Sequence, residues 1–172
     1  SFGLERAESA GIPSRVFLHQ DFSSNPAMDK AIGDYLDALN IDLIVLAGYM
    51  KILTKPFTQR FTGKILNIHP SLLPKYPGLH TYQRALKNGD SEHGTTVHFV
   101  NEEIDGGAIV LQAKVPIFPG DTVEEIELRT REQEYNIYPL VIKWFIEDRL
   151  KLIENQAYLD GKLLPPNGYA YE

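Results

Sequence analysis

The segment IDLIVLA, residues 41–47, limits the possible folds of this 172-residue chain more than any other part of it. Its last five residues are all apolar, and such an unbroken run is typical of a parallel strand that is buried on both faces. The preceding residues, 28–39, carry apolar side chains at steps of three and four, the spacing of a helix that packs on another element. A helix followed by a buried parallel strand is half of a β-α-β unit, so the sequence predicts an α/β fold.

The remaining elements follow from local patterns. Residues 70–78 contain three prolines, so we expect a stiff loop there rather than regular structure. Thr122 and Glu125 have the spacing of a capping box at the start of a long helix. Other elements are expected as follows: strands at 15–18 and 64–69, helices near 55–61 and 81–87, hairpin strands at 93–100 and 108–115, the capped helix to about 147, and a small hairpin at 151–164.

Together these elements predict a single domain, residues 1–172. We expect an open, mostly parallel Rossmann-like sheet with helices on both faces. An antiparallel hairpin is expected toward the C-terminal half, because the strands at 93–100 and 108–115 flank an acidic loop with two adjacent glycines.

Composition argues against several classes of function. Seventeen basic and 23 acidic residues give a net charge of −6, which repels polyphosphate and disfavours general nucleic-acid binding. The absence of cysteine removes disulfides, thiolate nucleophiles and zinc sites with sulfur ligands. No apolar run reaches the ~18 residues of a membrane span, and no basic-then-apolar leader opens the chain. We therefore expect neither nucleic acid nor membrane as a partner, and a cytoplasmic location.

Two polar side chains stand at the end of the strand expected at 64–69. Strand side chains alternate, so Asn67 and His69 share one face while Leu66 and Ile68 share the other. Ligands of open α/β sheets bind beyond the carboxyl ends of the strands, and a buried unpaired polar group costs about 1–3 kcal/mol. Position alone leaves two interpretations open: a functional pair, or a pair satisfied by neighbouring backbone.

Asp105 is the candidate third partner. It precedes Gly106 and Gly107, which allow the backbone to turn tightly beside another element. If the hairpin borders the strand at 64–69, the Asp105 carboxylate faces the His69 imidazole and favours its charged form. Without further context, the simpler interpretation of Asp-Gly-Gly is an ordinary turn.

The histidine spacings do not suggest a metal. His93 and His98 are five residues apart, which places them on opposite faces of a strand, and His19 and His80 have no partner at ligand spacing. The chain also contains neither a GxGxxG nor a P-loop pattern. We expect no metal and no nucleotide loop of these kinds.

Two longer motifs carry a resemblance to a known family. The runs NIHPSLLPKYPGLH at 67–80 and HGTTVHFVNEEIDGGAIVLQ at 93–112 closely resemble the folate-dependent formyltransferases. Within that family they are similar to the members that act on glycinamide ribonucleotide. The likeness extends from residue 2 through the tail LDGKLLPPNGYA at 159–170, so it covers essentially the whole chain.

The resemblance implies a purine-biosynthesis enzyme that transfers a formyl group from the co-substrate 10-formyltetrahydrofolate to the amine of glycinamide ribonucleotide, without a metal, as a monomer or homodimer. It assigns catalysis to Asn67, His69 and Asp105. In that scheme, His69 and Asn67 donate toward the oxygen that gains charge, and Asp105 keeps the imidazole charged. The implied folate contacts are Met50, Lys51, Ile52, Leu53, Asn101, Glu102, Glu103 and Ile104, and the implied substrate contacts are Gly48, Ile68, Pro70 and Glu134.

The start of the chain departs from the family pattern. Family members begin with a strand and a Gly/Ser/Asn loop that grips the ribonucleotide phosphate, whereas this chain opens with SFG. We expect that a first β-α unit of ~30 or more residues is missing, that the domain is truncated at its N-terminus, and that the chain as given binds ribonucleotide weakly.

Two alternatives come from the same family and one from a different class of function. A formyltetrahydrofolate hydrolase usually has a further regulatory domain, for which 172 residues leave no room. A methionyl-tRNA formyltransferase needs an RNA-binding domain and a basic surface, and the net charge disfavours it. A folate-binding fragment without full activity remains open, because the folate segments are present while the phosphate loop is not.

Overall fold

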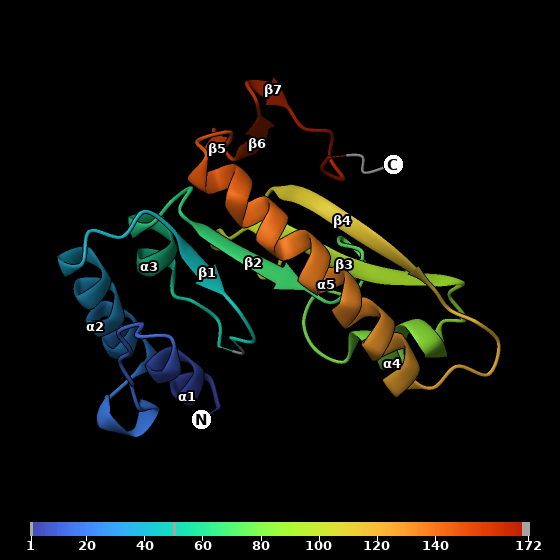
Figure 1. Cartoon of the computed structure of the whole chain (residues 1–172), viewed down its shortest axis with the longest axis horizontal. Helices are drawn as coiled ribbons and strands as arrows, with labels where there is room; N and C mark the ends of the chain where they lie inside the picture. Colours follow the sequence, from blue (N-terminus) through green and yellow to red (C-terminus); the bar gives the residue numbers. More distant parts are fainter. Residues whose placement is uncertain (1, 50, 170–172) are drawn as a thin grey trace. The chain divides into compact units, whose positions relative to one another are not determined.

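The structure is a computed structural model that describes residues 2–49 and 51–169 (Figure 1). It divides into two compact units, Ser1–Asn40 and Ile41–Glu172. The first unit contains helix α1 (Phe2–Ser9), the short 3-10 helix η1 (His19–Asp21) and helix α2 (Asn25–Ala38). Residues 15–18 do not form a strand, so that prediction is wrong. A strand needs a neighbouring strand to pair its N–H and C=O groups, and hydrophobic pattern alone does not supply one.

The second unit is built on a four-stranded sheet. Its order is β1 (Ile44–Leu46), β2 (Ile65–His69), β3 (Glu92–Phe99) and β4 (Ile109–Pro116). Strands β1 and β2 are parallel, whereas β2 pairs with β3, and β3 with β4, in the antiparallel sense. The predicted α/β fold with an antiparallel hairpin toward the C-terminal half is confirmed. The parallel part of the sheet is smaller than predicted, because among the described strands one pairing is parallel and two are antiparallel.

Strand β1 is shorter and more exposed than its sequence suggests. It covers three of the seven residues in the run 41–47, and Val45 is 40% exposed. Among the described strands β1 ends the sheet order and has β2 as its one neighbour. The expectation of a strand buried on both faces is therefore wrong for β1.

Helix α5 (Val123–Ile146) covers one face of this sheet, running across β3 and β4 (Figure 1). The core of the unit lies between them and combines Leu66, Val97, Phe99, Val110 and Leu111 of the sheet with Ile137, Tyr138, Val141 and Trp144 of the helix. Burying a large apolar side chain contributes roughly 1.5–3 kcal/mol. The Tyr138 hydroxyl also donates to the carbonyls of Leu46 and Leu66, at 2.6 and 3.1 Å, so the helix is tied to the two parallel strands.

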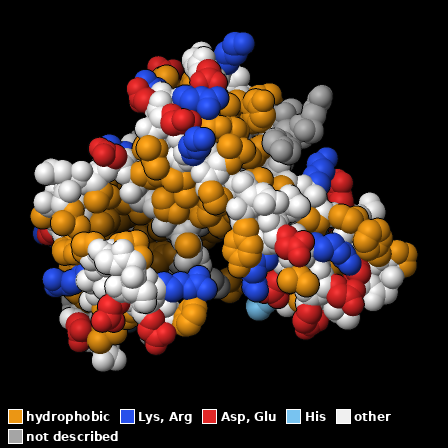
Figure 2. Space-filling view, viewed as in Figure 1, with side chains coloured by type: hydrophobic (Ala, Val, Ile, Leu, Met, Phe, Trp, Pro, Cys, Tyr) orange, Lys and Arg blue, Asp and Glu red, His pale blue; other side chains and the backbone are white. Residues whose placement is uncertain are grey.

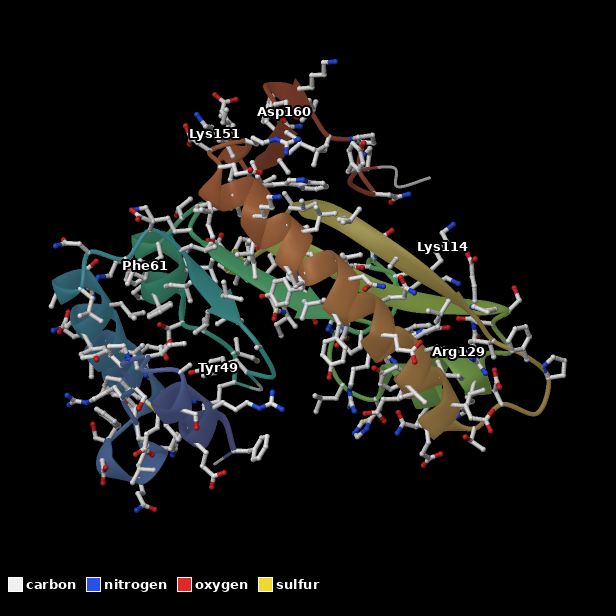
Figure 3. All side chains as sticks on the ribbon, in the orientation of Figure 1. Tyr49, Phe61, Lys114, Arg129, Lys151 and Asp160 are labelled. Atoms are coloured by element: carbon white, nitrogen blue, oxygen red, sulfur yellow. The ribbon has the colours of Figure 1, made fainter. Side chains whose placement is uncertain are left out.

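The remaining elements of this unit are short. Helix α3 (Lys55–Arg60) follows β1, and helix α4 (Thr81–Lys87) packs against α5. A small sheet follows α5 and contains β5 (Leu150–Ile153), β6 (Gln156–Leu159) and β7 (Lys162–Leu163). Its second turn is at Asp160, labelled in Figure 3, which confirms the hairpin predicted in the tail.

Charged side chains are mixed on the molecular surface. On the face shown in Figure 2, acidic and basic side chains are interspersed over α4 and the start of α5. Pairs such as Arg131 with Glu127, 2.6 Å apart, account for part of this mixing. Among the residues that the structure describes, no helix combines the length and apolarity needed to cross a membrane.

The N-terminus of α5 gives a direct test of the fold. The Thr122 hydroxyl accepts a hydrogen bond from the Glu125 amide at 3.2 Å, as the capping-box spacing predicts. We expect Thr122→Ala to lower the free energy of unfolding by about 1 kcal/mol, because an otherwise unpaired helical N–H loses its acceptor. Urea titration followed by circular dichroism measures this change. Thr122→Ser keeps the oxygen and is the matched control, and an equal loss in both variants would contradict the capping role.

Candidate functional site

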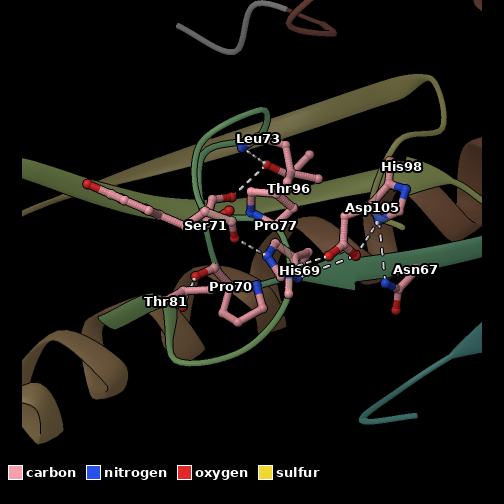
Figure 4. A network of polar contacts seen from close by, with 12 residues as sticks. Asn67, His69, Pro70, Ser71, Leu73, Pro77, Thr81, Thr96, His98 and Asp105 are labelled. Atoms are coloured by element: carbon pink, nitrogen blue, oxygen red, sulfur yellow. Dashed lines mark hydrogen bonds and ion pairs between the residues drawn. The ribbon is translucent and has the colours of Figure 1, made fainter. Parts of the chain in front are cut away.

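The carboxyl end of β2 supplies the first two candidate side chains. Leu66 and Ile68 face the hydrophobic core, as the alternation predicts, while Asn67 and His69 lie in a polar network on the other face (Figure 4). Strand β3 runs alongside and pairs Asn67 with His98. The polar side chains of β2 therefore lie next to those of an antiparallel neighbour at the end of the sheet.

Asp105 reaches this group from the loop between β3 and β4. Its Oδ1 lies 3.6 Å from Nδ1 of His69, and its Oδ2 accepts a hydrogen bond from the Gly78 amide at 2.8 Å. The side chains of His69 and Asp105 are only 8% and 12% exposed, so water screens their interaction weakly. The structure thus brings Asn67, His69 and Asp105 together at one place.

The loop that carries Asp105 is held by a close backbone approach. A Cβ at Gly107 would lie 1.7 Å from the Phe99 carbonyl oxygen, so only glycine fits there. Asp105 itself has a φ of 51°, in the left-handed region that aspartate tolerates better than most residues. The Asp-Gly-Gly sequence is therefore more than a turn signal, because its geometry sends the carboxylate back toward β2.

The proline-containing loop after β2, residues 70–78, is fastened to the sheet by buried hydroxyls. Thr96 donates to the Ser71 carbonyl at 2.7 Å and accepts from the Leu73 amide at 3.1 Å (Figure 4). The Gln112 side chain donates to the Leu73 carbonyl at 2.8 Å. These bonds hold the loop in place, and with it the Tyr76 carbonyl.

That carbonyl determines how the His69 ring is protonated. It lies 2.8 Å from Nε2 of His69, and because a carbonyl only accepts, Nε2 must carry a proton. Nδ1 faces the Asp105 carboxylate, also an acceptor. Both edges of the ring therefore face oxygen acceptors.

His98 is a site residue that sequence reasoning missed. Its Nε2 lies 3.4 Å from Nδ2 of Asn67 and 4.0 Å from Oδ1 of Asp105, and Nδ1 bonds to the Phe99 carbonyl at 2.8 Å. Burial lowers the pKa of His98 below its ordinary value, although the Phe99 carbonyl and Asp105 oppose the shift. The spacing of the histidines in the sequence bears only on whether they could bind a metal. It does not show the cross-strand register that pairs His98 with Asn67.

The residues expected to contact the amine substrate lie in β2, in the loops after β1 and β2, and in α5. Ile68 and Pro70 flank His69 in sequence, and Gly48 lies just beyond β1 at the same end of the sheet. Glu134 comes from α5, where its Oε1 lies 3.5 Å from the Thr95 hydroxyl, and that hydroxyl also donates to the His69 carbonyl at 3.0 Å. Glu134 is thus linked to the carboxyl end of β2 through one side chain.

The segments expected to contact folate lie in two loops. Met50 lies outside the described residues. Lys51, Ile52 and Leu53 lie between β1 and α3, and Ile52 is 66% exposed. The second segment, 101–104, begins the loop that leads to Asp105, and its first two residues line a cavity of about 300 Å³ together with Thr58, Gln59, Thr62, Val100, Leu152 and Asn155. That cavity does not bring the two segments together.

The donor set suits proton transfer and hydrogen bonding. Within residues 2–49 and 51–169, no three or more histidine, cysteine, aspartate or glutamate side chains gather into a potential metal site. A carboxylate, an imidazole and a carboxamide instead converge, and together they can stabilise a developing oxyanion and move protons.

Comparison with known proteins identifies the family. The family model described as formyl transferase matches residues 1–142. The chain belongs to the formyl transferase family. Phosphoribosylglycinamide formyltransferase of Haemophilus influenzae is 74% identical over the whole chain, which spans 81% of that relative. The protein of the same name from Escherichia coli K12 is 55% identical over 99% of this chain and 80% of its own length.

Solved structures agree with the family assignment. The phosphoribosylglycinamide formyltransferase of Coxiella burnetii, solved with CHES, superimposes with a TM-score of 0.95 at 42% identity, over all of this chain and 81% of that one. Glycinamide ribonucleotide transformylase 1 of Symbiobacterium toebii gives a TM-score of 0.88 at 42% identity, over 92% of this chain and 75% of that one. The resemblance and the fold class predicted from the sequence are confirmed.

We expect Glu134 to make the free energy of unfolding of this formyl transferase depend on pH. Burial raises the pKa of Glu134 above its ordinary value of 4.5, an effect opposed by Arg131 and Thr95. The Glu134 carboxyl group therefore binds its proton more tightly in the folded state than in the unfolded state. Its stabilising contribution is fully present below pH 4.5 and is lost as the pH rises through the raised pKa.

We expect Glu134→Gln to increase the free energy of unfolding at pH 7–8, because no charge is then buried, and to lose this gain as the pH falls below about 4.5. Denaturant titrations from pH 4 to 8 measure the effect. Glu132→Gln, on the exposed side of the same helix, controls for the removal of one negative charge. An increase in the free energy of unfolding that is the same at every pH would contradict a raised pKa of Glu134.

Proposed function

We propose that this formyl transferase moves the formyl group of 10-formyltetrahydrofolate to the primary amine of glycinamide ribonucleotide, also called phosphoribosylglycinamide, in purine biosynthesis. The observation that carries the proposal is the convergence of Asn67, His69 and Asp105 at the end of β2. The names of the relatives at 74% and 55% identity support the choice of acceptor. A formyl group supplied by a reduced folate needs no metal for this transfer.

The reaction requires two proton movements and one site of charge stabilisation. The amine nitrogen attacks the formyl carbon, forming a C–N bond, and negative charge develops on the formyl oxygen. The bond from that carbon to N10 of the folate then breaks and N10 gains a proton, while the attacking nitrogen loses one. The products are formylglycinamide ribonucleotide and tetrahydrofolate, so no oxidant or covalent enzyme intermediate is needed.

Asn67 and His69 are suited to stabilise the oxygen. One N–H of the Asn67 carboxamide faces His98, and the second is available to donate to a substrate oxygen. Preorganised donors of this kind are worth about 10²–10³ in rate. Asp105 would then hold the protonated His69 ring and accept, through water, the proton that the amine releases.

The Tyr76 carbonyl adds a requirement to this scheme. It accepts the Nε2 proton of His69 at 2.8 Å, while Nδ1 faces Asp105. Proton donation by His69 to the substrate therefore requires that the substrate replace one of these two acceptors. Residues 70–78 carry both the Tyr76 carbonyl and the Gly78 amide that binds Asp105, so this one loop supplies an acceptor to His69 and a donor to Asp105.

The other assignments belong to the same proposal. We assign amine binding to Glu134 with Gly48, Ile68 and Pro70, and folate binding to the loops at 50–53 and 101–104. Residues 101–104 lead directly to Asp105, so folate binding there would bring the formyl donor next to the carboxylate. The expected site of action is the cytoplasm, with the small-molecule substrates as partners and a monomer or homodimer as the assembly.

The activity can be tested with a labelled donor. Given 10-formyltetrahydrofolate with a ¹³C formyl carbon and glycinamide ribonucleotide, the protein should move the label into formylglycinamide ribonucleotide, followed by carbon NMR. Omission of the ribonucleotide is the control and should leave the donor intact.

Label that appears as formate at the same rate with and without ribonucleotide would identify a hydrolase and contradict the proposal. Label that stays on the folate in the complete reaction would also contradict it.

A further inference from the structure

We propose that His98 is a positioning residue, whose ring fixes the Asn67 carboxamide so that an N–H points toward the reacting oxygen. The inference rests on the proposed function, because it concerns how Asn67 serves formyl transfer. Nδ2 of Asn67 lies 3.4 Å from Nε2 of His98, a contact that no sequence pattern predicts (Figure 4).

The backbone fixes the proton on the His98 ring. Nδ1 lies 2.8 Å from the carbonyl oxygen of Phe99, and because that oxygen only accepts, Nδ1 must be the protonated nitrogen. In a neutral ring Nε2 then has a lone pair and accepts hydrogen bonds. The nitrogen that faces Asn67 is therefore an acceptor.

The surroundings of His98 keep its ring neutral. The side chain is 2% exposed, and burial lowers its pKa. Two charged or titratable groups face it, Asp105 with Oδ1 at 4.0 Å, which raises the pKa, and His69, which lowers it. Burial is the largest of these effects, so Nε2 stays an acceptor at neutral pH.

An acceptor at this point determines which way the Asn67 amide faces. A carboxamide has an NH₂ end and an oxygen end of similar shape, and only hydrogen-bond partners distinguish them. In the described part of the chain, the contact with His98 is the one hydrogen bond of the Asn67 side chain. If the amide turned over, its oxygen would face Nε2 and the substrate would lose a donor.

The backbone around His98 supports a positioning role. The register of β3 against β4 shifts between Val97 and His98, and irregularities of this kind redirect side chains next to active sites. The opposite neighbour is regular, since Asn67 pairs directly with His98 across β2 and β3. The backbone at His98 is thus paired with a strand on each side, while the Nε2 edge of its ring faces the polar cluster.

Two substitutions of His98 test the roles of its two ring nitrogens separately. In His98→Asn, the short amide keeps a donor near the Phe99 carbonyl and removes the acceptor that faces Asn67. In His98→Gln, the longer amide places an oxygen near the former Nε2 position. We expect His98→Asn to lower kcat about 10–100-fold with little change in KM, and His98→Gln to recover most of the loss.

A double-mutant cycle tests whether the effect passes through Asn67. Steady-state kinetics of formyl transfer are measured for the wild-type protein, His98→Asn, Asn67→Ala and the double variant. We expect His98→Asn to change kcat less than about threefold when residue 67 is alanine, because the group that it positions is absent. The proposal would be overturned if His98→Asn lowered kcat by the same factor with asparagine as with alanine at position 67. Full activity of His98→Asn would also overturn it.

A measurement on the unaltered protein keeps the proposal testable if a variant does not fold. Nitrogen-15 NMR of the histidine rings should show His98 neutral with its proton on Nδ1, and a proton on Nε2 would overturn the proposal. The two proposals fail differently: an inactive wild-type protein contradicts formyl transfer, whereas an active wild-type protein with an additive cycle contradicts only the role of His98.

Discussion

The arrangement of the site depends on the contacts of the Asp105 carboxylate. This carboxylate joins three segments of the chain, because Oδ1 faces His69 at the end of β2, Oδ2 binds the Gly78 amide of the following loop, and His98 of β3 lies 4.0 Å away. A nearly buried carboxylate without partners would be costly. The same contacts that satisfy it therefore bring the hairpin loop, the proline-containing loop and the central strand together, and they place a negative charge beside an imidazole.

The site retains features that do not favour stability. Glu134 is partly buried on α5, where burial raises its pKa and makes its charged form unfavourable, and Asp105 adopts a left-handed backbone conformation. Such departures from the most stable choice are typical of residues kept for function. The rigid parts are the core between α5 and the sheet and the Thr96 contacts that fasten the loop at 70–78. The residues with a proposed chemical role thus extend from a well-packed part of the structure.

Local patterns predicted most elements of the second unit, and non-local pairing explains what they missed. Side-chain alternation placed Asn67 and His69 on one face, and the capping-box spacing located the start of α5 at Thr122. The strand expected at 15–18 and the full burial of the run at 41–47 both needed neighbouring strands that sequence pattern does not specify. His98 and the Tyr76 carbonyl were missed for the same reason, since cross-strand register and loop position bring them to the site.

The substitution Asp105→Asn, which exchanges one carboxylate oxygen for an NH₂ group, tests the central claim most directly. Asp105→Asn keeps the size of the side chain and an oxygen for the Gly78 amide, and it removes the charge that faces His69. Single-turnover formyl transfer with saturating substrates should slow by about 10²–10⁴-fold, while circular dichroism and folate binding stay close to those of the wild-type protein. Formyl transfer at the wild-type rate would show that the charge of Asp105 does not serve the reaction and would contradict this account.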